Sequence, residues 1–119
     1  LRTGAAMHKA LTDDGYTNVT LVDFVGAGIC MIAHSRPDIC LLALHGSLGE
    51  DGAVQGFLEI MRIPYTGSGV SASAAAFDKY LSKLVFTACG IPTAEYWLDP
   101  GAVDAEKAGP CVGKPAREG

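Results

Sequence analysis

The chain has 119 residues, of which 49% are apolar and 18% are charged, and its formal net charge is −4 at pH 7. This length corresponds to one domain at most, and the composition is apolar enough for a packed core. Lysines and arginines nowhere form a run, which argues against a surface for nucleic acids or anionic membranes, because phosphate binding needs a basic patch. The longest apolar run, residues 39–44, is far shorter than the roughly 20 residues that cross a bilayer.

The start of the chain and its cysteines predict a cytoplasmic protein. Residues 1–6 contain no long apolar stretch and no initiating Met, so they do not resemble a signal peptide. The cysteines lie far apart, with no Cys-x-x-Cys pair and no histidine at zinc-finger spacing, at Cys30, Cys40, Cys89 and Cys111. We therefore expect buried free thiols in a reducing compartment, and neither disulfides nor metal ligands.

The first elements in chain order are a helix, a strand and a second helix. Residues 3–14 have apolar side chains at helical spacing, with Thr3 as a candidate cap and Gly15 where a helix would stop. Residues 16–23 predict a strand. Residues 24–33 predict a helix, although the two glycines within it weaken this interpretation.

The middle of the chain alternates between strands and helices. Residues 39–44 are continuously apolar, as expected of a strand that is buried on both faces of a parallel sheet. Residues 53–62 predict an amphipathic helix, whose first turn can donate hydrogen bonds to Asp51. A short extended segment at 64–66 then leads to a helix of small residues over 70–77.

The pattern changes after Phe77. Residues 78–89 predict a helix that ends at Gly90, and two strands are expected over 92–98 and 111–114. The first part therefore predicts an α/β domain, residues 1–77, with an open, mainly parallel, Rossmann-like sheet flanked by helices. Residues 78–119 are expected to begin a second structural layer, which is incomplete at residue 119.

The segment of residues 45–56 carries the strongest functional signal. It follows the carboxyl end of the predicted buried strand and opens a helix, which is where open α/β sheets bind ligands. His45 supplies an imidazole that titrates near neutral pH, and Glu50 and Asp51 are placed to orient it. The residues alone leave a second interpretation open: a tight strand–helix turn with an ordinary capping acid and a solvated histidine.

Six sequence blocks in order resemble the D-alanine–D-alanine ligases. The first block is His45-Gly46-x-x-Gly49-Glu50-Asp51-Gly52-x-x-Gln55-Gly56. The next three are Pro64-Tyr65-Thr66-Gly67-Ser68-Gly69-Val70, Ser73-Ala74 and Asp78-Lys79-x-x-Ser82-Lys83. The last two are Gly90-Ile91-Pro92-Thr93 and Lys114-Pro115-Ala116-Arg117-Glu118-Gly119. The resemblance covers most of the chain from Pro37 onward.

This resemblance implies a pre-ATP-grasp domain followed by the start of an ATP-grasp domain. It also implies ATP-dependent ligation of two D-alanines through an acyl phosphate, for peptidoglycan precursor synthesis. Lys79 and Lys114 match lysines that contact ATP phosphates, a role that suits a compact ammonium with three donors. His45 and Glu50 match positions near the D-alanine site. No catalytic residue and no metal ligand can be assigned, because the family's magnesium ligands lie further downstream.

The match departs from the family at three places. The chain lacks the first strand and the acidic residue that normally precede the first helix. The stretch between Trp97 and Lys114 is shorter than the family pattern, and Gly113 replaces the β-branched residue that a strand favours there. After Glu118 and Gly119 the family continues into a serine-bearing loop over the phosphates, so the 119 residues alone are expected to be inactive.

Two other functions remain open from the sequence. One is a non-catalytic α/β module that binds a small molecule or a partner, and the other is an ATP-grasp ligase with a different second substrate. Residues 67–72 fit G-x-G-x-x-A, but the preceding strand is short and no acid follows at ribose-binding distance, so a dinucleotide site is disfavoured. The resemblance also suggests a homodimer, in which the first helix could take part.

Overall fold

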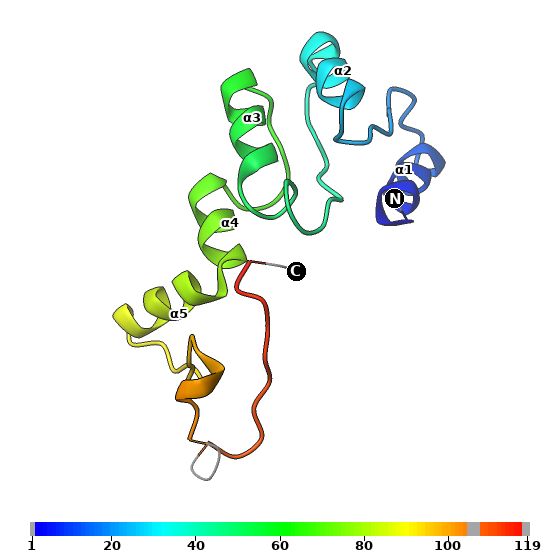
Figure 1. The fold of residues 1–119 in the computed structure, drawn as a ribbon. Coiled ribbons are helices and arrows are strands. Elements are labelled where there is room, and N and C mark those ends of the chain that lie inside the picture. Colours follow the sequence, from blue (N-terminus) through cyan, green and yellow to red (C-terminus); the bar gives the residue numbers. More distant parts are fainter. Residues whose placement is uncertain (1, 105–107, 118–119) are drawn as a thin grey trace.

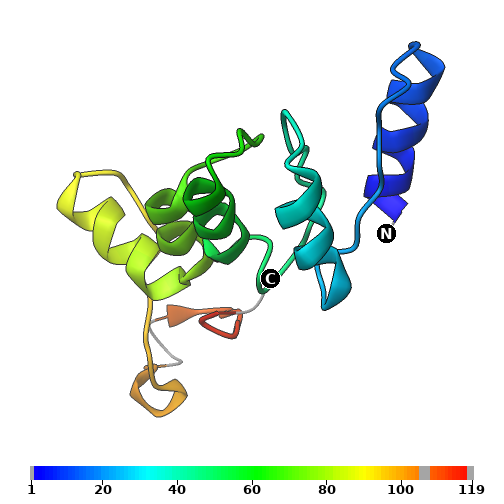
Figure 2. The same ribbon diagram turned by 90° about the horizontal axis from the view of Figure 1, so that it is seen from above.

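The computed structural model describes residues 2–104 and 108–117, which form five α-helices and a short 3₁₀ helix. Figures 1 and 2 show the helices following one another along the chain, with loops between them. The bounds are α1 Arg2–Asp13, α2 Ala27–Ser35, α3 Ala53–Met61, α4 Val70–Phe77, α5 Lys79–Ala88 and η1 Pro100–Ala102. All five predicted helices are therefore present, and α2 begins and ends slightly later than predicted.

Helix α1 ends as its sequence predicts but begins differently. Gly15 adopts φ 96°, its N–H bonds the Thr12 carbonyl at 3.2 Å, and the Tyr16 N–H bonds the Leu11 carbonyl at 3.1 Å. These two bonds satisfy the last carbonyls of the helix, and glycine reaches this left-handed conformation without a Cβ clash. The predicted capping role of Thr3 is wrong, because Thr3 lies inside the helix.

A small apolar core lies where α2 and α3 meet the loops that connect them. Its buried members are Ile32, Val54, Leu58 and Ile63, of which Val54 and Leu58 are fully buried. The Phe24 and Phe57 rings pack at its edge with centroids 5.7 Å apart. Because Val54 and Leu58 lie one helical turn apart, they share the face of α3 that the sequence pattern marked as apolar. This core fixes α3 and therefore the turn that precedes it.

The predicted parallel sheet is reduced to a single bridge, and among residues 2–104 and 108–117 there is no strand. Cys40 and Tyr65 form that bridge in parallel orientation. The Cys40 N–H bonds the Pro64 carbonyl at 2.8 Å, and the Thr66 N–H bonds the Cys40 carbonyl at 3.0 Å. The ladder stops there, because the next donor, Leu42 N, bonds the Thr66 hydroxyl instead of a backbone carbonyl.

The other predicted strands are also wrong for the described residues. Segments 16–23, 92–98 and 111–114 have no regular secondary structure. An apolar or β-branched segment forms a strand only when a neighbouring strand satisfies its backbone groups, and none of these segments pairs with another among the described residues. The connection between the last two of these segments, residues 99–109, lies partly outside the described residues and contains η1.

The molecule is elongated and leaves much apolar surface exposed. Its radius of gyration is 18.7 Å and its extents are 59 × 28 × 28 Å, whereas a compact domain of this length has a radius of about 13.5 Å. Its accessible surface is 8721 Å², compared with about 6,100 Å² for a compact protein of this mass. Apolar side chains of α5 stand among the exposed ones, namely Tyr80, Leu81, Leu84, Val85 and Phe86.

The cysteines are free thiols, as predicted, but the prediction that they are buried is wrong. Cys30, Cys89 and Cys111 are exposed and Cys40 is half-buried. The small core explains this result, because it has room for few side chains. Burial raises the pKa of the Cys40 thiol. None of the helices within the described ranges is long and apolar enough to span a bilayer.

Candidate functional site

The turn that carries His45 and Glu50 is held by hydrogen bonds from its own backbone to two carboxylates. Asp51 accepts from Leu48 N at 2.9 Å and from Ala53 N at 3.0 Å. Glu50 accepts from Gly46 N at 2.6 Å. The predicted role of Asp51 at the start of α3 is therefore confirmed. The hydrogen bond from Leu48, followed by that from Ala53, lowers the pKa of Asp51.

Two glycines of this turn are required by close packing and backbone conformation. A Cβ atom on Gly49 would lie 2.4 Å from the Leu44 Cβ. Gly52 has φ 95°, and a Cβ there would lie 2.9 Å from the Val70 carbonyl oxygen. A side chain at either position would force the turn away from the preceding segment or from α4. Both glycines therefore allow close packing of the turn against other parts of the same chain.

The buried side chain of Gln55 holds the turn through a hydrogen bond. Its side chain is only 4% exposed, and its Nε2 donates to the Gly49 carbonyl at 2.9 Å. That bond fixes which end of the amide carries the nitrogen, because a carbonyl accepts only from an N–H donor. The Gln55 Oε1 is buried without a hydrogen-bond partner among the described residues, so the amide contributes a single bond, directed at the turn.

His45 is exposed on the outer side of this turn. Its Nε2 lies 3.4 Å from the Thr3 hydroxyl, a long contact between the turn and α1. The predicted orientation of the imidazole by Glu50 and Asp51 is wrong, because both carboxylates bind backbone N–H groups of the turn instead. His45 and Glu50 nevertheless lie on one short turn at the carboxyl end of the segment that leads into it, where the sequence placed them.

The second predicted pair, Lys79 and Lys114, belongs to two segments that meet. The Lys79 N–H donates to the Ala116 carbonyl at 2.9 Å. Beside this bond, the Arg117 Nε donates to Asp78 Oδ2 at 2.9 Å. Figure 1 shows the last described segment, in red, returning to the junction of α4 and α5. Lys114, which is exposed, precedes this junction by two residues, so the two lysines belong to one region.

Asp78 is the residue on which this junction depends. Its Oδ1 accepts from Tyr80 N and Leu81 N, each at 3.0 Å, and so caps α5. Hydrogen bonds from Leu81 and Arg117 lower the pKa of the Asp78 carboxyl. The carboxylate therefore stays ionised at neutral pH, where it pairs with Arg117.

The half-buried side chain of Lys83 makes contacts within the protein. Its Nζ donates to the Thr93 hydroxyl and the Ala94 carbonyl, both at 2.7 Å. It also lies 5.7 Å from the centre of the Tyr96 ring, a cation–π distance. These three contacts hold the segment after α5 against the helix. The ammonium of Lys83 is thus bound within the chain.

The two regions are connected by packed helices. The turn leads directly into α3, α3 packs on α4, and α4 packs on α5 (Figures 1 and 2). The basic side chains beside α5 fit a polyphosphate group. Within residues 2–104 and 108–117, no three His, Cys, Asp or Glu side chains are grouped closely enough to hold a metal ion.

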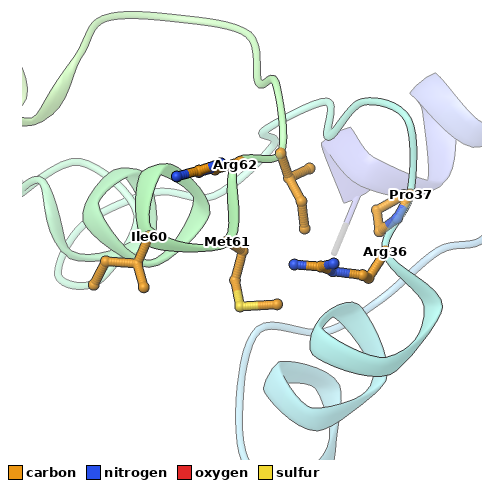
Figure 3. A pocket seen from close by; sticks show the side chains of 6 residues that line it. Arg36, Pro37, Ile60, Met61 and Arg62 are labelled. Atoms are coloured by element: carbon orange, nitrogen blue, oxygen red, sulfur yellow. The ribbon is translucent and has the colours of Figure 1, made fainter.

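A hollow of about 420 Å³ lies elsewhere, between the ends of α2 and α3. Its lining consists of Arg36, Pro37, Ile60, Met61, Arg62 and Ile63, which includes none of the predicted site residues. In Figure 3 the Arg36 side chain points toward Met61, whereas that of Arg62 points away from it. Each arginine directly follows its helix and has a left-handed backbone conformation. A positive charge is favoured at this end of a helix, near its last carbonyl groups. The hollow therefore reflects how the helices end.

Comparisons with known proteins show which proteins the chain resembles. Residues 31–68 match the family described as D-ala D-ala ligase N-terminus. A D-alanine–D-alanine ligase from Anaeromyxobacter sp. (strain Fw109-5) is 49% identical over 126 residues, an alignment that includes the whole chain. One from Azorhizobium caulinodans is 52% identical over 92 residues, which cover 77% of this chain and 30% of that ligase. The chain is a homologue of the D-alanine–D-alanine ligases.

The chain spans 41% of the length of the Anaeromyxobacter ligase. The alignment with that ligase is longer than the chain itself, so this homologue lacks some residues that its relative has. Among solved structures, the D-alanine–D-alanine ligase from Aeromonas hydrophila has a TM-score of 0.50 and 36% identity, covering 60% of this chain and 27% of that one. The resemblance inferred from the motifs is confirmed by these matches.

The sequence patterns assigned no role to three residues on which the two regions of the site depend. Gln55, Asp78 and Arg117 all stand in the motifs shared with the D-alanine–D-alanine ligases, but only their positions were noted. Asp78 directly precedes a helix, which is the usual place of a capping acid and would have identified half of its role. Its bond with Arg117 spans 39 positions, and no local pattern predicts such a contact.

Proposed function

We propose that this chain is part of an ATP-dependent ligase that joins two D-alanines for peptidoglycan precursor synthesis in the cytoplasm. In this reaction ATP phosphorylates the carboxylate of the first D-alanine. The amine of the second then attacks the acyl phosphate, and D-alanyl-D-alanine, ADP and phosphate are released. The proposal rests on the identity to ligases along the whole chain and on one observation above the others: the bond from Lys79 to Ala116 brings the two lysine-bearing segments together.

Each half of the site has a part in this proposal. His45 and Glu50, on the turn before α3, face the first D-alanine. The ammonium of this substrate suits the Glu50 carboxylate, and its carboxylate suits the His45 imidazole. Lys79 and Lys114 bind phosphate oxygens, where a positive charge stabilises the transferred group. Magnesium would neutralise further phosphate charge, through ligands that belong to the rest of the protein. Residues 1–77 would form the first domain, an α/β unit in which Cys40 and Tyr65 pair in parallel, and 78–119 would begin the ATP-grasp domain.

A titration of the ¹⁵N-labelled chain tests the two halves separately. D-alanine should shift the amide signals of the turn around His45 and Glu50, and L-alanine serves as the stereochemical control. ATP should shift signals around Lys79 and Lys114, whereas adenosine, which has no phosphate, should not. The 119 residues alone should release no phosphate from ATP with D-alanine, because they do not surround the nucleotide. Failure of both titrations would remove the support for this assignment.

A further inference from the structure

Two adjacent contacts fasten residues 116–117 to the start of α5. Asp78 and Lys79 are consecutive, and so are their partners Ala116 and Arg117. One contact joins backbone to backbone and the other joins two charged side chains. Two bonds on neighbouring residues fix the direction of a segment as well as its position, because a single bond would leave it free to pivot. The other hydrogen bonds described for residues 108–117 are local, from Ala108 and Cys111.

The Asp78 carboxylate has two separate tasks, one for each oxygen. Its Oδ1 caps α5 through Tyr80 and Leu81, and its Oδ2 accepts from Arg117. The Asp78 side chain is 17% exposed, whereas that of Arg117 is 79% exposed. The acid is therefore held in place by the helix, whereas the arginine is largely exposed. This asymmetry makes Asp78 the fixed half of the contact.

We propose that Asp78 and Arg117 are positioning residues that hold Lys114 beside Lys79, so that both ammonium groups meet one polyphosphate. The polyphosphate as the ligand rests on the function proposed above, whereas the fastening of the two segments does not. Asp78 touches neither nucleotide nor amino acid in this proposal. It acts through Arg117, whose segment carries Lys114, and through α5, whose first residue is Lys79.

A cross-linking experiment on the 119-residue chain tests the fastening without any ligand. An amine-reactive bifunctional reagent joins lysines that lie close together, and mass spectrometry gives the yield of the Lys79–Lys114 product. The Lys79–Lys83 product is the internal reference, because those residues lie one turn apart on α5 and do not depend on Arg117. Asp78→Asn keeps a capping side chain but removes the charge that Arg117 meets. Glu95→Gln, at an exposed acid, is the matched control.

The relative yield should fall about two- to five-fold in Asp78→Asn and in Arg117→Gln, the range expected for an exposed charge pair. The double variant should fall no further than either single variant, because both remove the same contact. Arg117→Lys should retain much of the yield. Circular dichroism verifies that α5 is still formed. An unchanged yield in both single variants, with the helix intact, overturns the proposal.

Titration with inorganic tripolyphosphate, followed by the Lys79 and Lys114 amide signals, tests the consequence for binding. Removing the negative charge of Asp78 should by simple attraction tighten the binding of an anion. The proposal requires the opposite: Asp78→Asn should bind tripolyphosphate about two- to five-fold more weakly, in line with the cross-link yield. Tighter binding by this variant contradicts the positioning role. If the wild-type chain binds no tripolyphosphate while its cross-link depends on Asp78, the fastening stands and the proposed phosphate site fails.

Discussion

Replacing Asp51 with alanine tests whether the turn that carries His45 is held by its own hydrogen bonds. The Asp51 carboxylate accepts from Leu48 N and Ala53 N. Leu48 has φ 69°, a conformation that costs energy for a branched side chain unless its surroundings fix it. Without the carboxylate, the first N–H of α3 and the N–H of Leu48 both lose their acceptor.

The size of the effect follows from these two bonds. Loss of a capping side chain costs about 1 kcal/mol, and loss of one further hydrogen bond costs about 1 kcal/mol. Water replaces part of each bond because the turn is near the surface, so we expect a net loss of about 1–2 kcal/mol. That corresponds to a roughly five- to thirty-fold larger population of the opened turn.

Amide hydrogen exchange measures this opening directly. The Val54 N–H bonds the Leu48 carbonyl at 3.1 Å across the turn, so its exchange rate reports whether the turn is closed. Asp51→Ala should accelerate exchange at Val54 by the factor given above. Asp38→Ala is the matched control, because Asp38 is an exposed acid whose side chain makes no described contact. Equal exchange rates at Val54 in the two variants would refute the role of Asp51.

The pH dependence of the same signal has a defined sign. Because hydrogen bonds from Leu48 and Ala53 lower the pKa of Asp51 in the folded chain, its stabilisation is complete above the ordinary carboxyl pKa of about 4. It is lost as the pH falls through the lowered folded value. Wild-type Val54 should therefore lose protection only in acid below about pH 4, whereas Asp51→Ala should lack this component.

Three further changes test the core, the turn and the segment after α5. Leu58→Ala empties a side-chain position that is 0% exposed and should cost about 2–5 kcal/mol, whereas Ile60→Ala, at 83% exposure, should leave the urea midpoint unchanged by circular dichroism. Gly49→Ala places a Cβ 2.4 Å from another Cβ atom and should lower Tm, while Gly113→Ala, with nothing within 4 Å, should not. Lys83→Met removes two hydrogen bonds of 2.7 Å and should speed limited proteolysis just after α5. Unchanged cleavage would show that this ammonium does not hold that segment.

The helices were predictable because their signals are local. Apolar spacing placed α3, Gly15 marked the end of α1, and Asp51 marked the approach to α3. Each of these signals acts within a few residues of the structure it determines. By contrast, Arg36 and Arg62 end α2 and α3 in the left-handed conformation that glycine usually takes. Their side chains gave no sign of it, because the backbone bonds of the preceding helix impose that conformation.

The strands were not predictable from the segments alone. Residues 39–44 have the apolar composition of a buried strand, yet only Cys40 is paired among the described residues. Helix hydrogen bonds are supplied by the segment itself, whereas strand hydrogen bonds are supplied by a neighbour that may be distant in sequence. The Leu42 N–H illustrates this difference, because it finds the Thr66 hydroxyl where a further strand residue would offer a carbonyl.

The candidate site divides in the same way. The motifs identified His45, Glu50, Lys79 and Lys114 as candidate site residues, but they did not predict which groups these residues contact. Glu50 was expected to face the imidazole of His45 and instead closes the turn through Gly46. An exposed carboxylate has backbone N–H donors within a few residues of it, and these compete with a more distant side chain.

The two halves of the site depend on forces of different range. The turn before α3 is closed by bonds within eight residues and rests on Val54 and Leu58, which are buried. The lysine region is closed by a backbone bond between Lys79 and Ala116 and by an ion pair across 39 positions, whose arginine is exposed. Salt screens such a pair but leaves a buried apolar contact intact. The amino-acid side of the proposed site is therefore built into the local chain, and the phosphate side depends on two segments staying together.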